Sequence, residues 1–164
     1  MMFVRQLRHR LLCMAATLTL LTLSCAANSQ AMLPPATDLA ADAIESTRTG
    51  APLIVMLSLQ GCPHCGVVRR SHLLPLLNDP TSKPRPIVRQ IEINGTARLR
   101  DFDGSTITHA EFAARHKFKL APVVMFFGNK GEMLAKPLVG SMIPDFYGAY
   151  LDAALTEARA KLVK

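Results

Sequence analysis

Two cysteines three residues apart, Cys62 and Cys65, are the side chains of this sequence best suited to chemistry, and Pro63 and His64 separate them. The pair follows an apolar, β-branched run at residues 53–57, which predicts a buried strand, and precedes a helical pattern of aliphatic residues. Cys62 is therefore expected at the start of a helix. Unpaired backbone N–H groups and the helix dipole stabilise a thiolate there, and the thiolate is the form of cysteine that attacks a disulfide.

The remaining residues of the motif suit a redox-active dithiol. Cys65 would lie one helical turn beyond Cys62, close enough to form a disulfide with it or to resolve a mixed disulfide. Pro63 fits the first helical turn, which needs no backbone donor, and a charged His64 would further stabilise a Cys62 thiolate. We therefore predict an enzyme, a thiol–disulfide oxidoreductase, whose catalytic residues are Cys62, Pro63, His64 and Cys65. No cofactor and no resident metal are expected.

Two other interpretations of the cysteine pair stay open. The thiolates, with or without His64, would suit Cu(I), because that ion prefers soft ligands. The chain would alternatively be a non-catalytic binding module. A structural zinc site usually needs four ligands, and beyond residue 31 the chain holds only Cys62 and Cys65 as cysteines.

The N-terminal segment predicts export. Three arginines precede an apolar run at residues 11–23, and no acidic residue occurs before Asp38. This pattern is typical of a secretory signal peptide, and the run is shorter than the roughly 20 residues of a membrane span. We predict a signal peptide over residues 1–31, cleavage near Ala31 and a periplasmic mature protein, in preference to an uncleaved anchor or lipid attachment at Cys25.

Removal of the predicted signal peptide would change both the cysteine count and the net charge of the protein. Two of the four cysteines, Cys13 and Cys25, lie in the predicted signal peptide. The mature chain would thus enter an oxidising compartment without a framework of structural disulfides. Loss of the three signal arginines lowers the formal net charge from +7 to +4. The cations are scattered and no nucleic-acid motif occurs, so we expect no nucleic-acid partner.

The sequence of the mature chain predicts a linker over residues 32–36 and a single domain over residues 37–164. Pro75 is expected to kink or end the helix that carries the cysteines. Residues 96–105 show no clear element, and His109 and His116 are expected at the surface of a short helix. Further expected elements are a helix capped by Thr37 or Asp38, strands at 87–93 and 123–127, a helix with a capping box from Thr108 to Glu111, a hairpin turn at 128–131 leading to a strand at 132–139, and a helix from Pro144.

This order of elements resembles the thioredoxin superfamily over residues 38–164. The matching motifs are Gly61-Cys62-Pro63-His64-Cys65, Ala121-Pro122 at the start of a strand, Phe127-Gly128-Asn129-Lys130-Gly131, and Val139-Gly140 before the last helix. The chain is most similar to small exported bacterial thioredoxin-like proteins of the SoxW and DsbC-catalytic-domain type. The resemblance implies an α/β, thioredoxin-like fold, in which helices flank a central mixed β-sheet of about four strands.

The resemblance also implies roles for individual residues. Cys62 would attack and Cys65 would resolve. Ala121 and Pro122 would bind substrate, with Pro122 as a cis-proline facing the disulfide and the Ala121 backbone pairing with an extended substrate. The implied partners are protein thiols and disulfides and an unidentified redox-recycling protein, for which a membrane protein is a candidate. We expect a monomer.

The sequence departs from thioredoxins at two points. Met56 occupies the position of their buried carboxylate, and the chain contains no tryptophan. The Pro63-His64 dipeptide is instead that of the periplasmic oxidant DsbA. A stabilised Cys62 thiolate favours the reduced protein and makes the disulfide oxidising. The direction of electron transfer therefore stays open.

Overall fold

The computed structural model describes residues 32–81, 83–141 and 144–162. The predicted signal peptide and Cys25 lie outside the described residues. No helix in the described ranges is both long and apolar enough to cross a membrane. The main sheet has four strands in the order β2-β1-β5-β6, and their bounds are β1 Leu53–Ser58, β2 Ile87–Glu92, β5 Val123–Phe127 and β6 Leu138–Val139.

The sheet is mixed, as the resemblance to the thioredoxin superfamily implies. β1 runs parallel to β2 and antiparallel to β5, and β5 runs antiparallel to β6. β1 and β5 occupy the centre, and every residue of both strands is buried. This agrees with their continuous apolar composition, because a strand that is covered on both faces needs no polar alternation.

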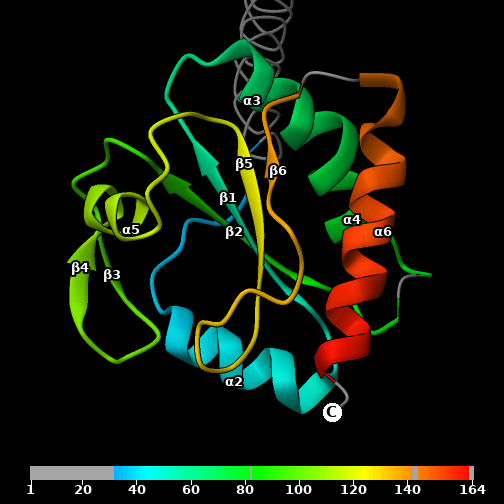
Figure 1. The fold of residues 1–164 in the computed structure, drawn as a ribbon, viewed down its shortest axis with the longest axis horizontal. Coiled ribbons are helices and arrows are strands. Elements are labelled where there is room, and N and C mark those ends of the chain that lie inside the picture. The colour runs from blue at the N-terminus through cyan, green and yellow to red at the C-terminus, as the bar shows by residue number, and fades with distance from the viewer. Residues whose placement is uncertain (1–31, 82, 142–143, 163–164) are drawn as a thin grey trace, which may run out of the picture. The chain divides into compact units, whose positions relative to one another are not determined.

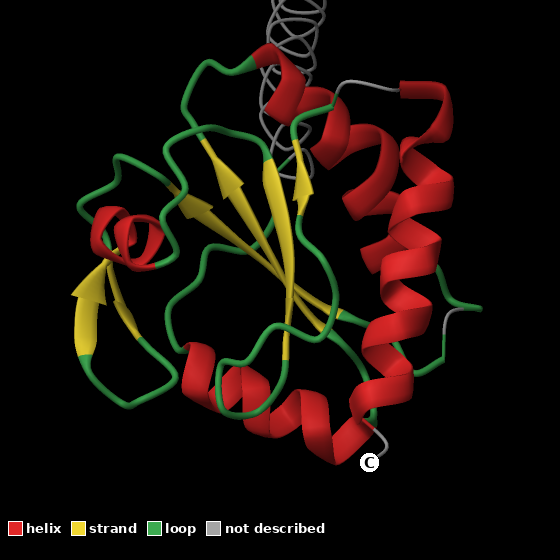
Figure 2. Cartoon of the chain, viewed as in Figure 1, coloured by secondary structure: helices red, strands yellow, loops and turns green. Residues whose placement is uncertain are grey.

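The side chains of β1 alternate between two apolar cores. Ile54 and Met56 face a core that includes residues of α3 (Pro63–Val68) and α6 (Pro144–Leu162). Leu53, Val55 and Leu57 face the opposite core, together with α2 (Leu39–Thr49) and α5 (His109–Arg115). Figures 1 and 2 show the resulting three layers, with α3 and α6 on one side of the sheet and α2 and α5 on the other. The period-2 geometry of a strand produces this division.

The predicted cap of α5 is confirmed, and of the two residues predicted to cap α2, Thr37 and Asp38, the structure uses Asp38. The Asp38 side chain accepts a hydrogen bond of 2.8 Å from the backbone N–H of Ala41 and begins α2, and Gly50 ends it at a φ of 68°. Thr108 and Glu111 form the capping box of α5. These short-range hydrogen bonds satisfy backbone donors that a helix start leaves free, so a few local residues suffice to predict them.

The helix that follows the cysteines is interrupted before Pro75. α3 passes into the π-helical turn η3 (Arg69–Leu73), and a regular helix resumes as α4 (Leu74–Asn78), with Pro75 in its first turn. A proline has no backbone N–H, and its ring collides with the carbonyl four residues earlier. The wider π turn accommodates this defect, so the predicted disturbance at Pro75 takes the form of a π-bulge.

Residues 98–108 form a second, two-stranded sheet that the sequence does not predict, and its first strand lies in the region at 96–105 where no clear element was expected. β3 (Arg98–Arg100) pairs with β4 (Thr106–Thr108) in antiparallel fashion. Phe102 lies in the connection, and its ring contacts those of Phe127 and Phe112, with centroids 4.9 and 6.4 Å apart. The two strands have only three residues each, too few for an alternating pattern to identify them.

Two further predictions need correction. Residues 32–36 are no free linker, because Leu33 and Ala36 are buried and the Ala36 N–H donates to the carbonyl oxygen of Gln90 at 2.9 Å. The strand expected at 132–139 is reduced to β6 and one bridge between Phe127 and Met133. Pro137 has no backbone donor, which limits pairing of this segment.

His109 is buried, contrary to the prediction of a surface position, whereas His116 is half-buried. His109 Nδ1 accepts a hydrogen bond of 3.2 Å from the backbone N–H of Glu92, so its proton lies on Nε2, which donates to the carbonyl oxygen of Ala36 at 3.0 Å. One imidazole thereby links α5, β2 and the N-terminal segment. The sequence around His109 contains no sign of these partners, because they are 17 and 73 residues away.

Replacing His109 by leucine should lower the free energy of unfolding by about 2–3 kcal/mol, because a part-buried N–H and a buried carbonyl would lose their partner. Urea denaturation would measure this. His116→Leu is the matched control, since the described residues show no side-chain hydrogen bond to His116 and leucine keeps its apolar contacts. Equal effects of the two substitutions would contradict the structural role of His109.

Candidate functional site

Cys62 and Cys65 form a disulfide at the N-terminus of α3, with their Cα atoms 5.3 Å apart. Cys62 is the N-cap residue of that helix, and its Sγ accepts a hydrogen bond of 3.1 Å from the backbone N–H of Cys65. Pro63 occupies the first helical turn. Gly61 precedes the motif at a φ of 75°, a backbone conformation that glycine adopts without strain. The chain can therefore turn sharply from β1 into the helix.

The two sulfur-bearing residues differ in exposure. Cys65 is completely buried against the apolar core that contains Met56 and Val68. Cys62 is partly exposed, and Pro63 and His64 are exposed. A thiolate arriving from solvent can therefore reach the Cys62 sulfur, whereas Cys65 is shielded by the fold.

Ala121 and Pro122 lie next to this disulfide. Cys62 Sγ is 4.0 Å from the carbonyl oxygen of Ala121, a van der Waals contact, because a disulfide sulfur carries no proton to donate. The Ala121–Pro122 peptide bond is cis. The Pro122 carbonyl accepts a hydrogen bond of 2.8 Å from the backbone N–H of Gly140. The fold thus brings all six residues singled out in the sequence to one end of the sheet.

His64 has a partner that the sequence does not predict. Its Nδ1 lies 3.0 Å from the hydroxyl oxygen of Ser141, which follows β6. The two residues are 77 positions apart. The hydrogen bond connects the exposed side of the motif to the segment that leads into α6.

A chain of polar side chains behind the motif was also not predicted. Arg69 donates from Nε to Gln90 Oε1 at 2.9 Å and from a terminal nitrogen to the Ser58 hydroxyl at 3.2 Å. Gln90 Nε2 donates to Glu92 Oε1 at 2.6 Å. The other carboxylate oxygen, Glu92 Oε2, is buried and has no hydrogen-bond partner among the described residues. The polar residues that interrupt the apolar pattern of β2 are the one signal that could have indicated this cluster.

The polar cluster borders a cavity of about 460 Å³ beside the disulfide, which Cys62, Pro63, Arg69 and Glu92 help to line. Met56 is fully buried and pairs with Gln90 across the parallel strands. The departure from thioredoxins at Met56 is therefore accompanied by polar groups on the neighbouring strand. Within the described ranges, no three His, Cys, Asp or Glu side chains come together in a way that could hold a metal ion.

Comparison of whole structures finds similar folds at low sequence identity. A DsbH oxidoreductase matches with a TM-score of 0.51 and 13% identity, over 82% of this chain and 92% of that chain. The oxidised form of mitochondrial thioredoxin 3 from Saccharomyces cerevisiae matches with a TM-score of 0.50 and 14% identity, over 79% and 99% of the two chains. No family model matches the sequence, and neither does any curated protein.

These similarities show that the chain has a thioredoxin-like fold. A disulfide between cysteines three residues apart stands at the start of a helix in that fold. The expected fold class, an α/β structure with a mixed sheet of four strands flanked by helices, is confirmed.

After reduction, Cys62 should react with iodoacetamide at least about tenfold faster than Cys65, because Cys62 is accessible and lies at the helix start. Mass spectrometry after short exposure would locate the modified residue. The Cys62→Ser variant should be alkylated slowly at its remaining thiol. Equal modification of both cysteines in the folded protein would contradict the arrangement described.

Proposed function

We propose that the protein is an exported thiol–disulfide oxidoreductase that exchanges disulfides with protein substrates through Cys62 and Cys65. The observation that carries the proposal is the disulfide at the N-terminus of α3, with one accessible and one buried cysteine, beside the Ala121–Pro122 segment. Export rests on the sequence pattern of residues 1–31.

The exchange begins at the accessible sulfur. A substrate thiolate attacks Cys62 Sγ, the Cys62–Cys65 bond breaks, and Cys65 leaves as a thiolate that takes up a proton. A second substrate thiolate then attacks the substrate sulfur of the mixed disulfide and releases Cys62 as a thiolate. The substrate has gained a disulfide and the protein two electrons. Run in reverse, the same steps reduce a substrate disulfide, with Cys65 resolving the mixed disulfide.

The groups around the motif support these steps. The backbone N–H of Cys65 that donates to Cys62 Sγ is one of the donors that a helix start leaves free, and it stabilises negative charge on that sulfur. His64 would add to this stabilisation when charged. Ala121 would pair through its backbone with an extended substrate, in the manner of a strand added to a sheet, and Pro122 would hold that backbone against the disulfide.

Stabilisation of the Cys62 thiolate also affects the direction of electron transfer. A more stable Cys62 thiolate favours the reduced protein, so the disulfide becomes a stronger oxidant. We propose a moderately oxidising centre in a periplasmic monomer. A separate protein, with a membrane protein as the candidate, would restore its redox state after each cycle.

The Cys65→Ser variant should accumulate mixed disulfides at Cys62 in cells that produce it with its signal sequence, because no thiol remains to release the partner. Non-reducing electrophoresis followed by mass spectrometry would reveal the adducts. The Cys62→Ser variant, which keeps the buried cysteine, is the control and should trap none. Absence of adducts in both variants would count against exchange with protein substrates.

Equilibration with glutathione buffers should yield a reduction potential above that of thioredoxin, which is roughly −270 mV. His64→Ala should lower the potential by about 30 mV or more, because the Cys62 thiolate loses a stabilising neighbour. Gln60→Ala alters an exposed residue outside the cysteine pair and serves as the control. A potential at or below that of thioredoxin would indicate a reductase instead.

A further inference from the structure

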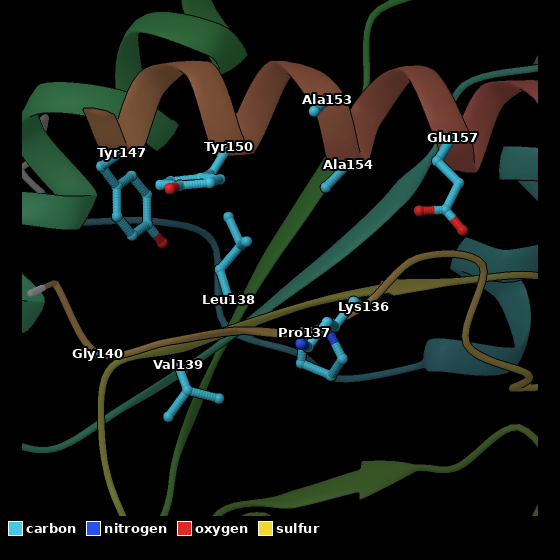
Figure 3. Close-up of a pocket in the computed structure, with 10 residues that line it drawn as sticks. All are labelled: Lys136, Pro137, Leu138, Val139, Gly140, Tyr147, Tyr150, Ala153, Ala154 and Glu157. Carbon is cyan, nitrogen blue, oxygen red and sulfur yellow. The ribbon is translucent and has the colours of Figure 1, made fainter. Parts of the chain in front are cut away.

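A groove with a volume of about 430 Å³ lies between α6 and the segment that contains β6 (Figure 3). Its lining is mainly apolar and includes Leu138 from the strand and Tyr147, Tyr150 and Ala153 from the helix. The volume falls within the usual range of ligand sites, and the few polar groups among apolar walls are typical of them. The proposed exchange reaction does not use this groove.

Tyr147 provides a hydrogen-bond donor for which the described ranges contain no acceptor. The residue is only 6% exposed, and its hydroxyl is buried with no hydrogen-bond partner among the described residues. The hydroxyl points into the space between α6 and the β6 segment (Figure 3). The ring packs against His72 at a centroid distance of 4.7 Å. Burial raises the pKa of Tyr147, so the hydroxyl keeps its proton. A buried donor normally has an acceptor, and a bound molecule would supply one.

One end of the groove adjoins the proposed active site. Gly140 lines the groove, and its backbone N–H donates to the carbonyl oxygen of Pro122 at 2.8 Å. The next residue, Ser141, is within hydrogen-bond distance of His64 between the cysteines. A chain bound across Ala121 and Pro122 therefore meets the groove when it continues past Gly140.

The neighbouring strand favours an extended polypeptide as the occupant. β6 is the edge of the main sheet, and among the described residues no strand pairs with its outer side. Val139 is 52% exposed there. In an extended chain the side chains alternate in direction, so one side chain can enter the groove while a backbone carbonyl faces the Tyr147 hydroxyl. Pro137 lacks a backbone donor and would limit the paired stretch to a few residues.

We propose that this groove binds an apolar side chain of the substrate polypeptide, a few residues from the cysteine that reacts with Cys62, while Tyr147 donates to a substrate carbonyl. This inference rests on the proposed function and adds a preference for substrate sequence to it. Backbone pairing at Ala121 is indifferent to side chains, whereas an apolar groove selects among them.

The probes are fifteen-residue peptides of serine and glycine with a cysteine at the centre and one leucine, which is moved in single steps from two to seven residues away from the cysteine on either side. Each reduced peptide reacts with the oxidised protein, and acid quenching with mass spectrometry yields the rate. We expect a maximum at one spacing, about tenfold above the peptide with serine in place of leucine, because filling an apolar pocket with one aliphatic side chain contributes on that scale. Glutathione serves as the control thiol, because it carries no apolar side chain that could occupy the groove.

Ala153→Leu should abolish the maximum, because the added side chain fills the groove from an exposed position of α6. Ala160→Leu is the matched control: it makes the same substitution at an exposed residue of the same helix that does not line the groove, and it should keep the maximum. Both variants should react with glutathione at the rate of the unaltered protein.

Tyr147→Phe separates binding from folding. It removes the hydroxyl and keeps the ring that packs against His72. The rate at the preferred spacing should fall about fivefold, the effect of one hydrogen bond, while the glutathione rate stays unchanged and the thermal midpoint is equal or higher. A residue of purely structural importance would change the midpoint and leave the spacing preference unaltered.

The outcomes separate this inference from the proposed function. If glutathione and all peptides react at similar rates whatever the position of leucine, the groove does not bind substrate and the proposed function stands. If Ala153→Leu slows glutathione as much as the peptides, the groove assignment is also overturned. If neither glutathione nor any peptide exchanges with the disulfide, the proposed function fails, and this inference fails with it.

Discussion

The antiparallel pairing of β1 with β5 is the constraint on which the site depends. Leu57 near the end of β1 lies opposite Val123 at the start of β5. The chain that leaves β1 toward Cys62 and the chain that enters β5 through Ala121 and Pro122 are therefore held at the same edge of the sheet. Because each strand is buried on both faces, a shift of register by one residue would exchange the residues of the two cores and is strongly disfavoured.

The surroundings of the disulfide are divided between apolar and polar groups. Cys65 belongs to the same apolar core as Met56, the residue at the position where thioredoxins carry a buried carboxylate. Polar groups lie instead on β2 and on the helix that follows the motif, and Glu92 and Arg69 of that cluster reach the cavity beside Cys62. Polar groups that could accept or donate a proton during exchange therefore lie on the side of Cys62, whereas Cys65 faces the apolar core.

The segment after β6 connects the two surfaces to which we assign function. Gly140 is hydrogen-bonded to Pro122 and lines the groove under α6, and Ser141 meets His64. A polypeptide held at the disulfide and a side chain held in the groove would thus contact one continuous stretch of backbone. Substrate recognition and disulfide exchange would then depend on the same segment, which the pairing of β6 with β5 attaches to the main sheet.

The sequence by itself was sufficient for features governed by neighbouring residues. It predicted the buried central strands, a cap at Thr37 or Asp38, a cap at Thr108, and the cysteine pair at a helix start, because apolar periodicity, capping hydrogen bonds and helix polarity act over a few residues. The two-stranded sheet, the burial of His109, the polar cluster with Glu92 and the contact of His64 with Ser141 appeared only in the tertiary structure. Each joins segments that are far apart in the chain, and their meeting follows from the order of strands in the sheet and the packing of helices on its faces. The hydroxyl of Tyr147, which has no hydrogen-bond partner in the part of the chain that the structure describes, belongs to the same group, since only the packing of α6 beside β6 determines what it can reach.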